Sequence, residues 1–123
     1  MTAWNGSDLK QIGTAEELDL QSERANGTLR APVTMWVVRA GDHLYVRSVK
    51  GADGPWYRGA QTRQQGCIEA GGVRRDVAFH EAEPSEYASV DAAYRDKYGR
   101  YTGIVDHVLT DKARASTLRL EPS

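Results

Sequence analysis

The chain has 123 residues, with 16 basic and 17 acidic side chains and a formal net charge of −1. Hydrophobic residues make up 40% and charged residues 27%, which is ordinary globular usage and excludes a globally disordered chain. The length fits a single domain over residues 1–123, and the balanced charge gives no general attraction to nucleic acid or to an anionic membrane.

The N-terminal part of the chain predicts a helix, a strand and a turn. Ser7 or Asp8 can cap a short helix that ends at Gly13. Residues 16–22 alternate apolar and polar side chains, which is the pattern of a half-buried strand. Residues 24–28 contain Asn-Gly, a pair that readily adopts positive φ, so we expect a turn there.

A hairpin is predicted next. Residues 33–39 are apolar on both faces, which favours a buried central strand. Gly41-Asp42 turns the chain, and residues 43–49 form the partner strand.

A loop, a helix and a second hairpin follow. Residues 51–55 predict the loop, and residues 56–65 predict a short helix that ends at Gly66. Residues 67–70 and 73–81 predict two strands joined at a Gly-Gly turn.

The C-terminal part predicts helices and one last strand. Pro84 opens a helical segment whose apolar face continues, after a break near Gly99, as far as Leu109. Residues 116–120 predict the strand. Strands and helices do not alternate, so we expect an α+β fold: a small antiparallel, closed or half-closed β-barrel with short helices covering its ends.

The cellular compartment is predicted from what the chain lacks. Cys67 is the single cysteine, so neither an intramolecular disulfide nor a cysteine-rich metal site can form. Residues 1–6 do not resemble a signal peptide, and no apolar run approaches the roughly 18 residues of a membrane span. We therefore expect a cytoplasmic protein.

Common catalytic patterns are missing. The three histidines, His43, His80 and His107, fall on separate elements without metal-ligand spacing, so we interpret them as surface or satisfied residues and expect no metal site. The chain has no Walker loop, no Gly-x-Gly-x-x-Gly after a strand and no serine in a nucleophile-elbow context. Cys67 begins a predicted strand, which favours a packed thiol.

Two segments carry candidate binding residues. In residues 24–32, Arg24 and Arg30 flank a turn at Gly27 and can present donors to a phosphate or carboxylate. The alternative is an ordinary hairpin loop with solvated arginines.

The second segment combines a strand end with a helix start. The strand end supplies a hydroxyl, an ammonium and a glycine backbone from Ser48, Lys50 and Gly51, and the helix start supplies N–H groups with the aromatic pair Trp56 and Tyr57. This combination suits an anion with an attached flat ring. The alternative is that the aromatic pair plugs the barrel end while the cations face water.

Both segments resemble motifs of a known superfamily. The pattern Arg24-x-x-Gly27-x-x-Arg30-x-Pro32 is similar to the Arg-Lys-Ser-Gly-x-x-Arg-x-x-Pro loop of deazaflavin-dependent nitroreductases, a branch of the split-barrel superfamily that binds flavin mononucleotide (FMN) or a deazaflavin. Residues 45–51 and 55–58 resemble that branch's strand, Ser-Lys-Gly loop and Trp-Tyr helix start.

Within this superfamily, the chain resembles a family of small bacterial proteins, domain-of-unknown-function family 2255. The similarity lies in four motifs, at residues 36–39, 45–48, 56–58 and 93–98.

The resemblance implies a split barrel that binds FMN or a deazaflavin and pairs as a homodimer. Arg24, Gly27 and Arg30 would approach one part of the cofactor's phosphate region, and Ser48, Lys50 and Gly51 another. Trp56 would support the ring or the barrel mouth. Two departures are evident: Ala25-Asn26 replaces Lys-Ser, and Lys50 is displaced by one residue from the Ser-Lys-Gly pattern.

Three hypotheses for function follow. The first is a flavin- or deazaflavin-dependent reductase of a small organic molecule, in which the cofactor transfers hydride and Tyr45, Tyr57 and Tyr98 are candidate proton donors. The second is a split-barrel protein that has lost its cofactor and binds a small ligand or a protein partner. The third is a cofactor-independent biosynthetic enzyme that uses the barrel pocket.

Overall fold

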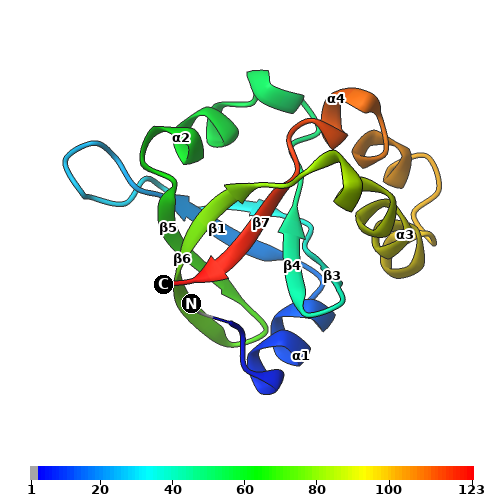
Figure 1. Ribbon diagram of the computed structural model, residues 1–123, viewed down its shortest axis with the longest axis horizontal. Coiled ribbons are helices and arrows are strands. Elements are labelled where there is room, and N and C mark those ends of the chain that lie inside the picture. Colours follow the sequence, from blue (N-terminus) through cyan, green and yellow to red (C-terminus); the bar gives the residue numbers. More distant parts are fainter. Residues whose placement is uncertain (1–2) are drawn as a thin grey trace.

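One antiparallel sheet of seven strands organises the computed structural model, which describes residues 3–123 (Figure 1). Met1 and Thr2, which belong to the N-terminal segment predicted not to be a signal peptide, lie outside the described residues. The strands run in the spatial order β2-β1-β5-β6-β7-β4-β3. They are β1 (Leu18–Ser22), β2 (Val33–Met35), β3 (Val38–Ala40), β4 (His43–Val46), β5 (Gln65–Ala70), β6 (Val73–Glu81) and β7 (Leu118–Pro122).

Helices lie at both ends of the curled sheet and along one side of it. In Figure 1, α1 lies at one end, α2 at the opposite end, and α3 beside β3 and β4. The helices are α1 (Gly6–Thr14), α2 (Pro55–Arg63), α3 (Tyr87–Tyr98) and α4 (Asp111–Arg114), with 3-10 turns η1 (Gly51–Asp53), η2 (Pro84–Glu86) and η3 (Val105–Val108). The predicted α+β half-barrel with short covering helices is confirmed.

Two hydrophobic clusters share strand β4. Leu44 and Val46 point into the main core inside the curled sheet, together with apolar residues of α1 and α2. Tyr45 points the opposite way, into a second cluster that includes Val90 and Tyr94 of α3. Because side chains alternate along a strand, β4 can serve both clusters at once.

The prediction of one buried strand over residues 33–39 is wrong. The segment divides into β2 and β3, which lie at opposite edges of the sheet, and Val33 is 38% exposed. The division falls at Trp36 and Val37. The ring of Trp36 stacks on that of Tyr98 at 4.0 Å, and the N–H of Val37 donates to the Tyr98 hydroxyl at 3.3 Å. The Tyr98 hydroxyl therefore accepts a hydrogen bond from a backbone N–H that would otherwise pair with a neighbouring strand.

Both predicted hairpin turns are confirmed, at β3–β4 and β5–β6, but the strand predicted over residues 43–49 ends at Val46. The helix predicted over residues 56–65 ends earlier, at Arg63, because Gln64 adopts a left-handed conformation with φ of 58°. Gly66 is therefore not the helix stop and lies inside β5. A Cβ at Gly66 would lie 2.1 Å from the carbonyl oxygen of Gln21, so glycine permits the close approach of β1.

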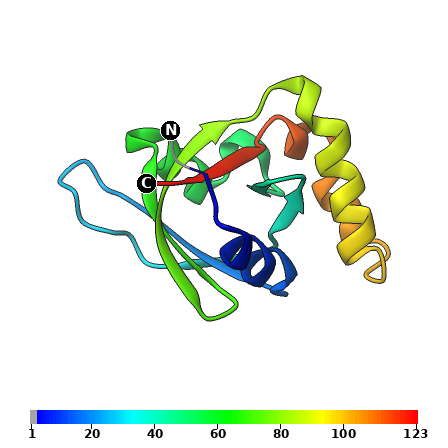
Figure 2. The same cartoon turned by 60° about the horizontal axis from the view of Figure 1, so that its bottom comes forward.

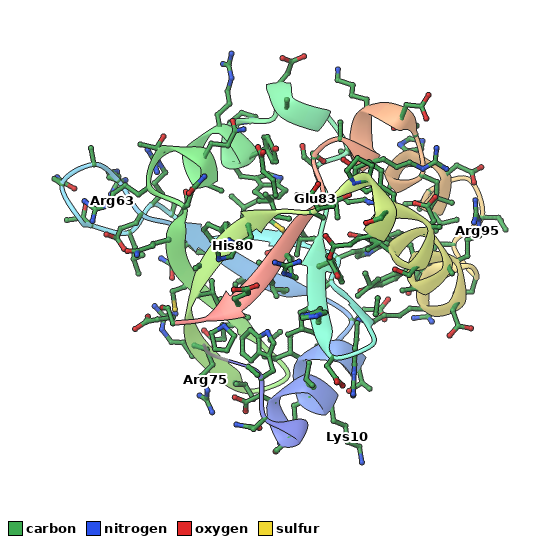
Figure 3. The ribbon with its side chains drawn as sticks, in the orientation of Figure 1. Lys10, Arg63, Arg75, His80, Glu83 and Arg95 are labelled. Carbon is green, nitrogen blue, oxygen red and sulfur yellow. The ribbon has the colours of Figure 1, made fainter. Side chains whose placement is uncertain are left out.

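The arm between β1 and β2 extends away from the rest of the molecule (Figure 2). Arg63, at the end of α2, holds it: its guanidinium lies 3.2 Å from the Glu23 carboxylate and donates to the carbonyl oxygen of Ala25 at 2.9 Å (Figure 3). The described part of the chain contains no helix that is long and apolar enough to span a membrane.

Candidate functional site

A cleft of about 450 Å³ lies where the end of β4, the start of α2, strand β2 and turn η3 meet. Its lining combines charged, hydroxyl and apolar side chains. The lining residues are Glu17, Val33, Thr34, Met35, Trp36, Arg47, Ser48, Val49, Lys50, Gly54, Pro55, Trp56, Ile104, His107 and Val108. We call it the main cleft.

One wall of the main cleft is polar. Ser48 is buried, and its backbone N–H donates to Ser116 Oγ at 2.8 Å, which fixes the chain just after β4. A Cβ on Gly54 would lie 2.4 Å from Ser48 Oγ, so the absence of a side chain at Gly54 leaves room for that hydroxyl. Pro55 opens α2, and the N–H groups of Trp56 and Tyr57 that follow have no partner within the helix. Such a helix start favours an anion.

The opposite part of the lining is apolar. Val33, Val49 and Ile104 are the exposed large hydrophobic residues of the described chain, at 38%, 56% and 58% exposure, and all three line the main cleft. Met35 and Trp36 continue this surface. Exposed apolar side chains that gather at one place indicate a surface that a ligand or another protein covers.

Arg47 contacts the main cleft but is committed to the fold. Its side chain is fully buried, its Nε donates to Thr117 Oγ1 at 2.8 Å, and its Nη1 donates both to the Asp91 carboxylate and to the carbonyl oxygen of Val108. Its guanidinium also lies over the ring of Tyr94 at 5.4 Å. Arg47 thus attaches η3 and α3 to the barrel beside the cleft.

A second cleft of about 330 Å³ adjoins the first. Arg24 and Arg30 line it, and it shares Val33, Pro55 and Trp56 with the main cleft. The two clefts meet at Trp56, so the predicted arginine pair lies next to the predicted Ser48–Lys50 segment.

The two arginines differ in how they are held. Arg24 is exposed, and its Nη1 donates to the carbonyl oxygen of Leu29 at 2.8 Å. Arg30 is half-buried, and its Nη1 bridges the carbonyl oxygens of Glu23 at 2.9 Å and Gly59 at 3.4 Å. Arg24 therefore keeps more freedom to meet a ligand, while Arg30 joins the arm to α2.

Three predicted site residues lie outside both linings. Gly27, with φ of 87°, lies in the turn of the arm. Gly51, with φ of 65°, packs against Lys112, whose Cγ would lie 2.3 Å from a Cβ on the glycine. Tyr57 is buried, and its hydroxyl donates to Glu81 Oε1 at 3.1 Å. The structure therefore brings together Ser48, Lys50, Trp56, Arg24 and Arg30.

The three candidate tyrosines do not line either cleft. The Tyr45 hydroxyl donates to Glu86 at 2.6 Å, and Tyr98 donates to the carbonyl oxygen of Glu16 at 2.8 Å. Burial raises the pKa of both phenols, and burial together with Glu81 raises the pKa of Tyr57 to about 12. No sequence motif includes His107, yet His107 lines the main cleft.

Solved structures with a similar fold belong to proteins that are named for different cofactors. An F420-H2 dependent reductase is 18% identical, with a TM-score of 0.67 over 86% of this chain and 94% of that one. An FAD-binding protein from Mesorhizobium loti is 13% identical, with a TM-score of 0.62 over 98% and 91%. HutZ, the heme storage protein from Vibrio cholerae, is 14% identical, with a TM-score of 0.63 over 96% and 89%.

These similarities confirm the split-barrel fold, and at such low identity they show the fold alone. No curated protein matches the sequence. A family model described as "Uncharacterized protein conserved in bacteria (DUF2255)" matches residues 8–120, nearly the whole chain. The four motifs at residues 36–39, 45–48, 56–58 and 93–98 all fall within this match. The chain therefore belongs to the bacterial DUF2255 family of split-barrel proteins.

Proposed function

We propose that this protein binds FMN or a deazaflavin in the main cleft and acts as a reductase of a small organic molecule. The observation that carries the proposal is the meeting of Ser48, Lys50 and the start of α2 with an exposed apolar wall in one cleft of about 450 Å³. A phosphate-bearing flat ring needs both kinds of surface. The solved structures described as an F420-H2 dependent reductase and an FAD-binding protein support this choice of ligand class.

The residues present fit such a group. Lys50 and Arg24 supply cationic donors on either side of Trp56, and Ser48, whose hydroxyl has room because Gly54 carries no side chain, adds a hydroxyl to the cleft lining. The indole of Trp56, where the two clefts meet, offers a flat surface to a ring. When bound, the cofactor supplies the hydride chemistry, and the chain binds and orients it and limits water on its apolar side.

A homodimer is part of this proposal. A second copy that covered Val33, Val49 and Ile104 would bury the exposed apolar rim and close the cleft from solvent. The resemblance to split-barrel homodimers supports the same arrangement.

The test is a calorimetric titration of the purified protein with FMN and, separately, with F420. We expect micromolar or tighter binding of one of them. Replacing Arg24 and Lys50 together by alanine should weaken binding tenfold or more, because charge-assisted hydrogen bonds contribute roughly 1.5–3 kcal/mol each. Arg58→Ala is the matched control, since Arg58 is exposed on α2 but lines neither cleft.

Each result has a definite meaning. If the double variant keeps its fold by circular dichroism and binds as tightly as the parent, Arg24 and Lys50 do not hold the phosphate. If neither FMN nor F420 binds the parent protein, the reductase proposal is wrong.

A cofactor-free ligand-binding protein is the second candidate. The observation in its favour is the arm: Ala25 and Asn26 replace a cation and a hydroxyl of the nitroreductase loop, and Arg30 is held by backbone carbonyl groups. Such a protein would bind an apolar fluorescent probe in the main cleft while binding neither FMN nor F420. An Ile104→Asp change would then weaken binding of that probe.

A further inference from the structure

His107 contributes an imidazole side chain to the lining of the main cleft. It lies on η3, is exposed, and lines the cleft together with Ile104 and Val108 of the same segment. The sequence offers no distinction among the three histidines, but His43 and His80 do not line the main cleft. His43 begins β4 and approaches Tyr45, and His80, labelled in Figure 3, lies on β6 at 3.2 Å from Glu121 of β7.

The other ionisable groups of the cleft lining are Glu17, Arg47 and Lys50. In general, side chains of these types transfer protons near neutral pH less readily than an imidazole does. Arg47 is in addition enclosed by its partners Asp91, Thr117 and Val108. Histidine is the side chain that ordinarily gains and loses a proton in this range.

A hydrogen bond to the neighbouring residue fixes the backbone of η3 beside His107. Arg47 donates to the carbonyl oxygen of Val108, the next residue, at 2.9 Å. Asp91 of α3 binds Arg47 and also accepts from Arg114 Nε at the end of α4 at 2.9 Å, so α3 and α4 hold the guanidinium that bonds to η3. Asp106 lies on η3 itself, and Glu17 and Lys50 lie in the cleft lining.

We propose that His107 is the proton donor for the reduction that this cleft performs; the proposal rests on the function proposed above. The unsaturated bond of the substrate gains a hydride at one atom and a proton at the other. A reduced flavin or deazaflavin held in the cleft would supply the hydride with its two electrons and would itself be oxidised. The imidazolium of His107 provides the proton, becomes neutral imidazole and regains a proton from solvent.

The first test does not depend on activity. The imidazole signals of the three histidines are followed by NMR while FMN or F420, whichever binds, is added. We expect the His107 signals to shift in step with occupancy, and those of His43 and His80 to stay, because only His107 lines the main cleft. Saturable binding without a change at His107 would overturn the assignment.

The second test measures a single turnover. Reduced F420 or FMN is bound, menadione is added as the acceptor, and oxidation of the cofactor is followed by absorbance in the parent, His107→Gln and His43→Gln proteins. Loss of a positioned proton donor should slow His107→Gln by about a hundredfold. His43→Gln should match the parent both in rate and in cofactor affinity, and the rates are compared with each protein saturated with cofactor.

Rescue by a small molecule separates a proton donor from a structural residue. Added imidazole should restore part of the His107→Gln rate in proportion to its concentration and leave His43→Gln unchanged. Normal cofactor binding with a parent-like rate in His107→Gln, or a slow rate that imidazole does not raise, would reject His107 as the donor while leaving the proposed function intact. Absence of binding to both cofactors would overturn both proposals together.

Discussion

Arg47, directly after β4, and Asp91 of α3 form a charged pair that is almost fully buried. The Arg47 side chain is 0% exposed and that of Asp91 is 9% exposed. Every polar atom of a buried pair needs a partner, and here the further hydrogen bonds come from Thr117, Val108, Tyr87 and Arg114. An arginine within an apolar strand pattern is the one sequence signal that could have predicted such a pair.

Replacing Asp91 by alanine would leave the Arg47 charge buried among neutral groups. We expect the free energy of unfolding to fall by about 3–5 kcal/mol. Asp111→Ala is the control, because Asp111 binds the same Arg114 at 2.9 Å but its side chain is fully exposed, and such pairs contribute about 1 kcal/mol or less. Urea denaturation measures the free energy of unfolding of both variants. Similar losses in the two would show that the buried pair stabilises the fold no more than the exposed pair does.

Lys97 provides a pH-dependent contribution to stability. Its Nζ donates to the carbonyl oxygens of Ala15 and Val37, both at 2.6 Å, and burial lowers its pKa from the usual 10.5 to about 8. The unfolded chain therefore holds this proton up to a higher pH than the folded protein does. Unfolding takes up a proton between about pH 8 and 10.5, so this group makes the free energy of unfolding rise with pH in that window.

The comparison that isolates this effect is between the parent and Lys97→Met, each unfolded in urea at several pH values from 7 to about 10.5. The parent should gain stability relative to the variant as the pH rises through this range. Parallel curves for the two proteins would mean that Lys97 titrates alike in the folded and unfolded states.

At the scale of secondary-structure elements, the crossover from β2 to β3 carries the chain from one edge of the sheet to the other. The Tyr98 hydroxyl holds it by bonding to both the N–H and the C=O of Val37, and the Tyr98 ring stacks on Trp36. This crossover also places Met35 and Trp36 in the lining of the main cleft. A helix that is distant in sequence therefore decides where the edge strands begin and end.

Tyr98→Phe should remove those hydrogen bonds and keep the ring stack. We expect the free energy of unfolding to fall by about 1–3 kcal/mol, since the buried Val37 N–H loses its partner. Tyr101→Phe removes a hydroxyl that bonds the exposed Glu16 carboxylate at 2.6 Å and should cost clearly less. Thermal unfolding compares the stability of the two variants. Equal losses of stability would contradict the inference that the Tyr98 hydroxyl stabilises the crossover.

At the scale of the whole molecule, the exposed apolar residues are not spread over the surface. Val33, Val49 and Ile104 come from three separate segments and meet around the main cleft. A monomer would leave this rim in contact with water. The proposed homodimer would cover it and isolate the cleft at the same time.

Sedimentation velocity tests the dimer. If the rim is the interface, Ile104→Asp should shift the protein from dimer toward monomer, because a carboxylate would be buried in an apolar contact. Thr102→Asp adds the same charge at an exposed neighbouring position that does not line the cleft, and it should remain dimeric. A dimer that tolerates Ile104→Asp would place the interface elsewhere, and a monomeric parent would reject the dimer.

Local patterns in the sequence were sufficient for the fold class, the two hairpins and the family. Turns at Gly41 and at Gly71-Gly72, with strand-forming residues on either side, depend on neighbours in the chain, so they can be predicted without tertiary contacts. The same holds for the motif at Ser48 and Lys50 and for that at Trp56, which the structure places in one cleft.

Only the tertiary structure decided how residues 33–39 divide and which ionisable side chains reach the cleft. The division depends on Tyr98, 61 residues from Val37, and the enclosure of Arg47 depends on Asp91, 44 residues away. Apolar periodicity shows that a segment is buried, but it cannot show which distant side chain will pair with its backbone. For the same reason His107 looked like any other histidine until the packing of η3 placed it in the lining of the main cleft.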